Sequence, residues 1–221
     1  MFNKNNPSDE FLEKIKIYKK IHKEGQLLIN GSKKLPENTY DGKSTIGLAK
    51  IIKNIIQQNN FKSLLDYGCG KAYYYFNEFI IHNERITSLQ DYWNVNINLY
   101  EPCIEKFSDL PKSVSDLSIC IDVLEHIPES DIDWVLEEIS NYTSELMFLC
   151  IANFKAKALL TNGENAHINI HDSKWWFYKL LDVKKKFPKI KILALISSEN
   201  NDGKRDYFPI NIDDNMNNYL K

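Results

Sequence analysis

The stretch FKSLLDYGCGKA at residues 61–72 decides the fold of this chain. Its first half, residues 61–66, is a short apolar run that ends in an acid, which is the pattern of a buried strand. Gly68 and Gly70 follow at once, and glycine allows the backbone to turn tightly and to approach a ligand. We expect a helix from about residue 71 to residue 81 after them. The stretch therefore predicts a strand, a glycine turn and a helix.

Strands and helices alternate on both sides of this unit. Apolar residues recur at helical spacing in four further segments, at residues 10–28, 44–58, 131–142 and 175–183. Short apolar runs predict strands at residues 97–100, 117–121, 145–152 and 190–196, with an edge strand at residues 207–210. Such alternation is typical of a parallel α/β sheet. We therefore expect one Rossmann-like doubly wound sheet, mostly parallel, at residues 44–221, with an N-terminal helical extension at residues 1–43.

The composition is that of an ordinary globular protein. Of 221 residues, 43% are hydrophobic and 26% are charged, and the formal net charge of -2 does not favour a nucleic-acid partner. The four cysteines form no Cys-x-x-Cys pair, so the sequence suggests neither a zinc knuckle nor a redox motif. Free cysteines fit a reducing compartment. Residues 1–20 contain no signal-peptide core, and no apolar run approaches the ~20 residues of a membrane span. We expect a cytoplasmic protein with no membrane partner.

Polar residues stand at the ends of three predicted strands, where ligands bind in open α/β sheets. The first end is the glycine turn, beside which Asp66 could accept a hydrogen bond from a cationic or hydroxyl-bearing ligand. The second is Glu101 with Pro102, where an acid can accept from ribose hydroxyls. The third is DVLEHI at residues 122–127, which brings two carboxylates and an imidazole to the same edge. The alternatives are a turn that binds nothing, a surface glutamate, and a structural His126 that orders its loop.

Two of these segments resemble known motifs. DYGCG at residues 66–70 resembles motif I of the class I methyltransferases that use S-adenosylmethionine (SAM), and residues 122–127 resemble the segment after the fourth strand in many members. The resemblance covers about residues 44–150. It implies a cofactor site at the three strand ends, with the candidate residues Asp66, Gly68, Cys69, Gly70, Glu101, Pro102, Asp122, Val123 and Leu124.

The resemblance also implies a role for each strand end. Asp66 and the two glycines would hold the methionyl part of SAM, and Glu101 would hold the ribose. Asp122 and Leu124 would line the cleft near the adenine and the sulfonium.

The chain departs from the family pattern in three places. Ala72 stands where motif I usually has a third glycine, although alanine is small enough to keep the turn. The interval from the turn to Glu101 exceeds the roughly 20 residues expected after a dinucleotide turn, which indicates an insertion around residues 83–94. The interval from Glu101 to the third strand end is short, so the usual helix and strand with an adenine-binding acid are reduced. Asp109 and Asp116 both stay open as that acid.

The segment after the fourth strand, residues 153–174, should select the substrate. It is polar and rich in histidine and aromatic residues, and it starts at the edge of the sheet where ligands bind. We expect residues 162–171 to form a lid or wall beside the methyl group, with an ordinary surface loop as the alternative. The candidate substrate-binding residues are Asn165, His167 and His171.

The histidines also suggest candidate catalytic groups. A general base helps when the methyl acceptor is a hydroxyl or an amine, and His167 and His126 are the candidates. His167 and His171 stand four residues apart, a spacing that would let them share a metal on a helix. Ile168 and Ile170 alternate with polar residues, however, which indicates a strand. We therefore predict no metal site.

The sequence thus predicts a SAM-dependent methyltransferase that acts on a small polar acceptor, whose identity stays open. The arrangement is similar to that of a group of bacterial and phage methyltransferase-like proteins, which gives no substrate. A catalytically idle SAM-binding protein, whose N-terminal helix would serve a partner, is one alternative. An NAD-dependent oxidoreductase is another, although its fingerprint requires a glycine where Tyr73 stands.

Overall fold

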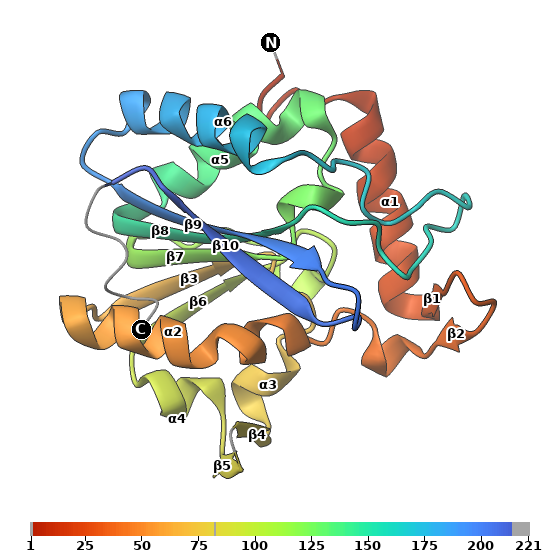
Figure 1. The fold of residues 1–221 in the computed structure, drawn as a ribbon, viewed down its shortest axis with the longest axis horizontal. Coiled ribbons are helices and arrows are strands. Elements are labelled where there is room, and N and C mark those ends of the chain that lie inside the picture. The colour runs from red at the N-terminus through yellow and green to blue at the C-terminus, as the bar shows by residue number, and fades with distance from the viewer. Residues whose placement is uncertain (1, 82, 214–221) are drawn as a thin grey trace.

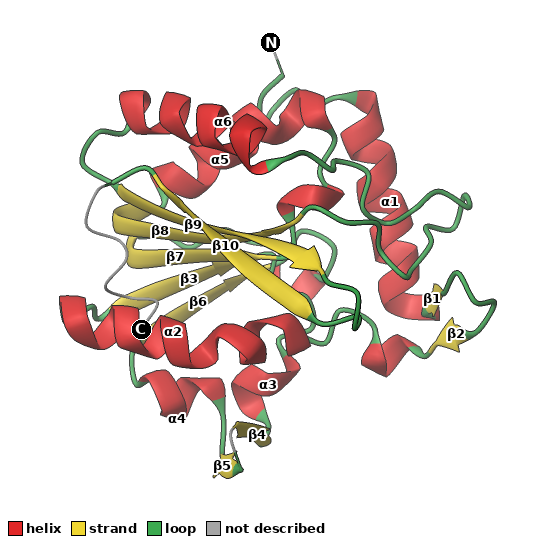
Figure 2. Cartoon of the chain, in the orientation of Figure 1, coloured by secondary structure: helices red, strands yellow, loops and turns green. Residues whose placement is uncertain are grey.

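The computed structural model describes residues 2–81 and 83–213, and a six-stranded sheet forms its centre (Figures 1 and 2). The strands in chain order are β3 (Ser63–Tyr67), β6 (Asn96–Tyr100), β7 (Ser115–Ile121), β8 (Thr143–Ala152), β9 (Lys191–Glu199) and β10 (Arg205–Asn211). Their order in the sheet is β10-β9-β8-β7-β3-β6. All neighbours are parallel except β10, which pairs with β9 in antiparallel register. The mostly parallel α/β sheet and its edge strand are confirmed, and the arrangement is consistent with a Rossmann-like fold.

Helices cover both faces of the sheet (Figure 1). One face carries α2 (Lys43–Asn59), α3 (Tyr73–Phe76) and α4 (Leu89–Trp93), and the other carries α5 (Ile132–Asn141) and α6 (Ser173–Lys186). Successive residues of β7 divide between the two cores, because side chains alternate across a strand. Leu117 and Ile119 pack in the core of α2, and Cys120 packs in the core of α5. Burial on both faces explains why the central strands are apolar along almost their whole length.

Helix α1 (Asp9–Glu24) precedes the strands of the sheet in the chain and packs against the segment that follows β8. The Ser8 hydroxyl caps it by accepting from the Phe11 N–H at 3.0 Å, and it donates to the Asp131 carboxylate at 2.5 Å. Ile17 and Ile21 pack on the segment that follows β8. Helix α1 and the loop after β8 therefore meet at the carboxyl edge of the sheet (Figure 1).

The predicted helix at residues 71–81 is wrong. After the glycine turn the chain forms only the four-residue α3, and then a hairpin of β4 (Phe79–Ile81) and β5 (Glu84–Ile86). Residues 73–81 are mostly aromatic and β-branched, and these residue types are weak helix formers. Tyr75 is buried beneath the sheet edge, so tertiary contacts and not a helical stripe position this segment. The expected insertion is present as the hairpin and α4.

The remaining elements are short. A two-residue hairpin pairs β1 (Gln26–Leu27) with β2 (Lys33–Lys34), and 3₁₀ turns lie at η1 (Pro36–Asn38), η2 (Glu105–Phe107), η3 (Leu124–His126) and η4 (Glu129–Asp131). Only η2 lies between β6 and β7, which confirms that the usual helix and strand are reduced there. None of the helices within residues 2–81 and 83–213 has the length and apolarity that crossing a membrane would require.

Candidate functional site

Two pockets open at the carboxyl edge of the sheet, where the strand order reverses. The chain passes from β3 to β6 on one side and then to β7 on the other, and ligands of open α/β sheets bind at such a switch point. The first pocket, of about 290 Å³, has α1 as one wall, and we call it the α1 pocket. The second, of about 340 Å³, has the segment after β8 as one wall, and we call it the loop pocket. Both pockets are lined by Tyr40, Gly68, Gly70, Asp122 and His126, so they meet at these residues.

The glycine turn has the left-handed backbone that its sequence predicts. Gly68 has a φ of 88° and Gly70 a φ of 56°. A Cβ at Gly68 would overlap the Val123 side chain, and one at Gly70 would overlap the Tyr40 carbonyl, both closer than 3.0 Å. The chain's own atoms fill these spaces. The glycines are therefore required for the close approach of the turn to Val123 and to Tyr40. The backbone of the turn forms part of the wall of both pockets.

The α1 pocket is mainly apolar and carries an acid at its end. Its walls include Phe11, Ile15 and Tyr18 of α1, opposite Tyr100 at the end of β6. Glu101 lines this pocket, and its Oε1 accepts from the Cys103 N–H at 3.0 Å. Burial raises the pKa of Glu101 above its ordinary value.

Asp66 lines neither pocket. It is 2% exposed, and its Oδ2 accepts from the Tyr75 hydroxyl at 2.5 Å. Burial raises the pKa of Asp66 to about 7, and the Tyr75 hydrogen bond opposes this shift. In this structure the acid of the motif anchors the short helix behind the turn.

The two open candidates for an adenine-binding acid also lie away from the pockets. Asp116 sits at the opposite edge of the sheet, where its Oδ2 accepts from the Lys62 and Ser63 N–H groups at 2.6 and 3.0 Å. Asp109 lines neither pocket. A further acid that lines the α1 pocket, in addition to Glu101 and Asp122, is Glu138 of α5, which accepts from the Tyr67 hydroxyl at 2.8 Å. Sequence reasoning missed it, because a helix interior gave no strand-end signal.

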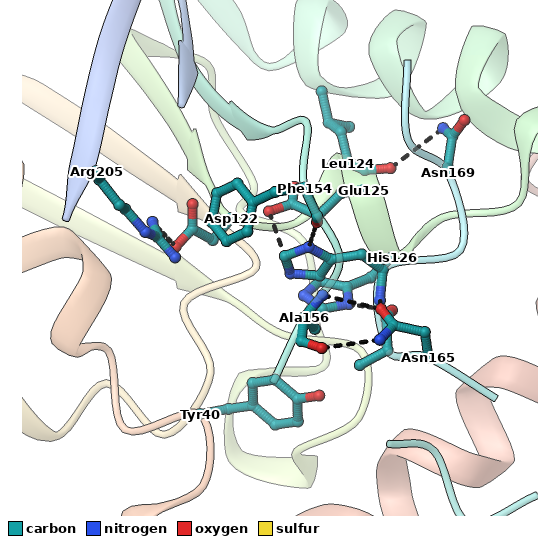
Figure 3. A network of polar contacts seen from close by, with 12 residues as sticks. Tyr40, Asp122, Leu124, Glu125, His126, Phe154, Ala156, Asn165, Asn169 and Arg205 are labelled. Carbon is teal, nitrogen blue, oxygen red and sulfur yellow. Dashed lines mark hydrogen bonds and ion pairs between the residues drawn. The ribbon is translucent and has the colours of Figure 1, made fainter. Parts of the chain in front are cut away.

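The three predicted cofactor residues after β7, which are Asp122, Val123 and Leu124, lie in different surroundings. Asp122 lines both pockets, has a φ of 54°, and pairs with Arg205 of β10 at 2.5 Å (Figure 3). Its other oxygen, Oδ1, is buried and has no hydrogen-bond partner within residues 2–81 and 83–213. Val123 lines the α1 pocket, whereas Leu124 is fully buried in the core and lines neither pocket. A left-handed backbone at a non-glycine residue is strained, and such strain is common at functional sites.

The remaining predicted cofactor residues are at the pocket walls. Cys69 lines the loop pocket and Pro102 lines the α1 pocket. Cys69, Cys103, Cys120 and Cys150 are all free thiols. Burial raises the pKa of the Cys69 thiol far above its ordinary value, so Cys69 is a neutral wall residue and not a thiolate nucleophile.

His126 and His167 lie side by side at the junction, with their ring centroids 4.9 Å apart. His126 Nδ1 is 2.7 Å from the Ala166 carbonyl oxygen, and His167 Nδ1 is 2.5 Å from that of Phe154 (Figure 3). A carbonyl only accepts, so each Nδ1 carries the proton and each Nε2 keeps a lone pair. Burial lowers the pKa of His126 to about 4 and lowers that of His167 as well. Both imidazoles are therefore neutral at pH 7.

The other two candidates for substrate binding lie outside both pockets. Asn165 bonds both backbone groups of Ala156, at 2.8 and 2.9 Å, and so orders the loop (Figure 3). His171 stacks on Trp175 with ring centroids 3.8 Å apart, and its Nε2 lies 2.9 Å from the Glu129 carboxylate. The expected strand at residues 168–170 is wrong, because these residues join no sheet. The pairing of His167 with His171 does not occur.

Three residues at the junction received no role from the sequence. Glu125 is fully buried, and burial raises its pKa well above the ordinary value; Asp122 adds to the shift, and the backbone N–H groups of Glu125 and Ala152 oppose it. Arg205 reaches the junction from the edge strand, and Tyr40 from the loop before α2. Glu125 lies within the segment at residues 122–127, so the sequence drew attention to it without giving it a role. No local sequence pattern marks Arg205 or Tyr40.

Comparison of the chain with family models, with curated proteins and with solved structures gives no match.

Proposed function

We propose that this chain is a SAM-dependent methyltransferase that transfers a methyl group to a small polar acceptor. The observation that carries the proposal is the junction of two different pockets at the switch point of the sheet. A group-transfer enzyme must bring donor and acceptor together in line, and two pockets that share a wall provide that geometry. The resemblance of residues 66–70 and 122–127 to methyltransferase motifs supports the same assignment.

The α1 pocket fits the donor. Phe11 and Ile15 supply apolar surface for a purine, and ligand pockets commonly combine such walls with a few polar groups. Glu101 has one oxygen engaged by a backbone N–H, and a carboxylate offers about four acceptor positions, so it can accept from ribose hydroxyls as well. When SAM is bound, its sulfonium supplies an already activated methyl group.

The chain's own residues then have two tasks, alignment and exclusion of water. Helix α1 covers the donor pocket, and Ile17 and Ile21 hold it on the loop after β8. The bare Nε2 of His126 or His167 is available at the junction to take the proton of a hydroxyl or amine acceptor. Burial lowers the pKa of both rings, so both are neutral at pH 7 and able to accept a proton.

The charges of the loop pocket favour an anionic acceptor. Four cationic and two acidic side chains line it, but Arg205 pairs with Asp122 and Lys157 pairs with Glu199. Among the residues that the structure describes, Lys34 and Lys43 form no ion pair and leave this pocket with an excess of positive charge. A carboxylate or phosphate on the acceptor would balance them.

The geometry disfavours the two alternatives. An NAD-dependent enzyme places a pyrophosphate at the start of a full helix, and α3 has only four residues, so its dipole is small. An idle binding protein would offer α1 to a partner, whereas the buried side of α1 is already packed on the loop and the α1 pocket.

Calorimetry with SAM, S-adenosylhomocysteine and NAD tests the donor. We expect the first two to bind and NAD to bind more weakly, and the reverse order would refute the proposal. An assay for S-adenosylhomocysteine release, run with anionic and neutral metabolite fractions, then tests the acceptor. Release that depends on neither fraction, in a protein that binds SAM, would favour the idle binding protein.

A further inference from the structure

Three potential metal ligands meet beside the pocket junction. Glu125, His126 and His167 each contribute one ligand atom, and these atoms all lie within 4.8 Å of one another. Two come from η3 and the third from the loop after β8, 41 residues further along the chain. His126 and His167 also line the loop pocket, so the cluster faces the predicted acceptor side.

The hydrogen bonds of the two histidines suit metal binding. Each Nδ1–H donates to a backbone carbonyl, at 2.7 Å for His126 and 2.5 Å for His167, and each Nε2 is left with its lone pair. Metal-bound histidines almost always donate their other ring N–H to a carbonyl, a carboxylate or a water, because this fixes the ring and its tautomer.

Glu125 brings a fully buried carboxyl group to this cluster. The side chain is 0% exposed, and neither carboxylate oxygen has a full hydrogen bond among the described residues, although the backbone N–H groups of Glu125 and Ala152 lie close enough to favour its charged form. A buried carboxylate without a partner is strongly disfavoured unless a counter-charge or a proton compensates it. Arg205 does not satisfy it directly, because its guanidinium pairs with Asp122.

The spacing is close to what a small cation requires. His167 Nε2 lies 4.0 Å from Glu125 Oε1. With metal–ligand bonds of about 2.0–2.2 Å, two ligands in a tetrahedral site lie roughly 3.4 Å apart. A side-chain rotation that closes about half an ångström would therefore bring both atoms onto one ion.

We propose that Glu125, His126 and His167 form a binding site for a divalent transition-metal cation, with open positions toward the loop pocket. Two imidazoles and one carboxylate favour Zn²⁺, Fe²⁺ or Co²⁺ over Mg²⁺, which prefers oxygen ligands. This proposal differs from the sequence-based prediction of no metal site. That prediction considered His167 together with His171, whereas in the structure His167 lies beside Glu125 and His126.

The role of the cation in methyl transfer rests on the proposed function. A hydroxyl bound at the open positions would have a lowered pKa and would lose its proton to water. The resulting oxygen would form the O–C bond as the C–S bond of SAM breaks and its electron pair passes to sulfur. The acceptor would then be an alcohol or phenol, and the His126 and His167 rings would bind the metal and not serve as bases.

Cobalt titration of the full chain, stripped with EDTA and without SAM, tests the site. We expect one Co²⁺ per chain, with visible absorption bands that report nitrogen and oxygen ligands. Glu125→Gln keeps the shape of the side chain, and His167→Asn removes one imidazole, and each should weaken Co²⁺ at least about 10-fold. His171→Ala, which removes a histidine outside the cluster, is the matched control and should bind Co²⁺ as the unmodified chain does.

Two results would overturn the inference. One is a folded chain that binds neither Co²⁺ nor Zn²⁺, and the other is unchanged Co²⁺ binding in both ligand variants, with circular dichroism to verify their fold. SAM calorimetry on the same sample separates this failure from that of the proposed function. SAM binding without metal binding would overturn only the metal site. Metal binding without SAM binding would support the site and remove its role in methyl transfer.

Discussion

Replacing Gly68 with alanine should destabilise the chain for two separable reasons. A φ of 88° costs a non-glycine residue roughly 1–2 kcal/mol. The new Cβ would also overlap Val123 Cγ2 and lie 3.0 Å from Cγ1, and overpacking of this kind costs about 1–3 kcal/mol. We therefore expect Gly68→Ala to lower the free energy of unfolding by about 2–5 kcal/mol.

Gly163 provides the matched control. Its φ is 86°, almost the same as that of Gly68, but a Cβ there would have nothing within 4 Å. Gly163→Ala should thus cost only the backbone strain, roughly 1–2 kcal/mol. Any loss of chain entropy in the unfolded state is common to both substitutions and cancels in the comparison.

Urea denaturation of both variants, with and without Val123→Ala, completes the test. Shortening Val123 removes the two γ-carbons, so Gly68→Ala should cost about 1–2 kcal/mol less in the Val123→Ala background than in the original chain. Equal losses in Gly68→Ala and Gly163→Ala, or no coupling between positions 68 and 123, would refute the reasoning that the turn is a packing point for residue 123.

Three further predictions concern single side chains. Glu101→Ala should weaken SAM by roughly 1.5–3 kcal/mol and leave methionine affinity nearly unchanged, and calorimetry showing equal losses for both ligands would place Glu101 away from the ribose. His167→Ala should leave SAM affinity within a few-fold and lower turnover on the acceptor by roughly 10²–10⁴-fold, and full turnover between pH 6 and 9 would assign His167 to packing. Burial raises the pKa of Asp66 from 3.8 to about 7, so its contribution to stability is complete below pH 4 and is lost as the pH rises to 7, by up to about 4 kcal/mol. Unfolding curves of Asp66→Asn should lack this loss between pH 4 and 7, and parallel pH dependence in the two proteins would contradict the assignment.

The sheet was predictable because its signals are local. The glycine turn and the apolar runs of β7 and β8 each lie within about ten residues, and burial on both faces makes these strands apolar throughout. The same signals located Glu101 and Asp122 at the pocket edge. The predicted helix at residues 71–81 failed for the opposite reason, because Tyr75 is positioned by its bond to Asp66 and not by helical periodicity.

The composition of the junction was not predictable from local patterns. Asp122 pairs with Arg205, 83 residues away, and His126 lies beside His167, 41 residues away. Local spacing offered His167 only His171 as a partner, and it led to the prediction of no metal site, since a helical turn or a strand is all that local spacing can describe. The partners of Asp122 and His126 come from β10 and from the loop after β8, and these segments reach the two residues only when the sheet has formed.

The charges at the junction support a cationic donor over an anionic one. In the α1 pocket Lys4 pairs with Glu138, whereas Glu101 has no cationic partner among the residues that the structure describes. SAM carries a sulfonium and an ammonium against one carboxylate, so it brings net positive charge to an acidic pocket. NAD would bring a pyrophosphate to the same acid, with no long helix to offset the repulsion. Since opposite charges attract most strongly where water is excluded, the burial of Glu101 increases this preference for SAM.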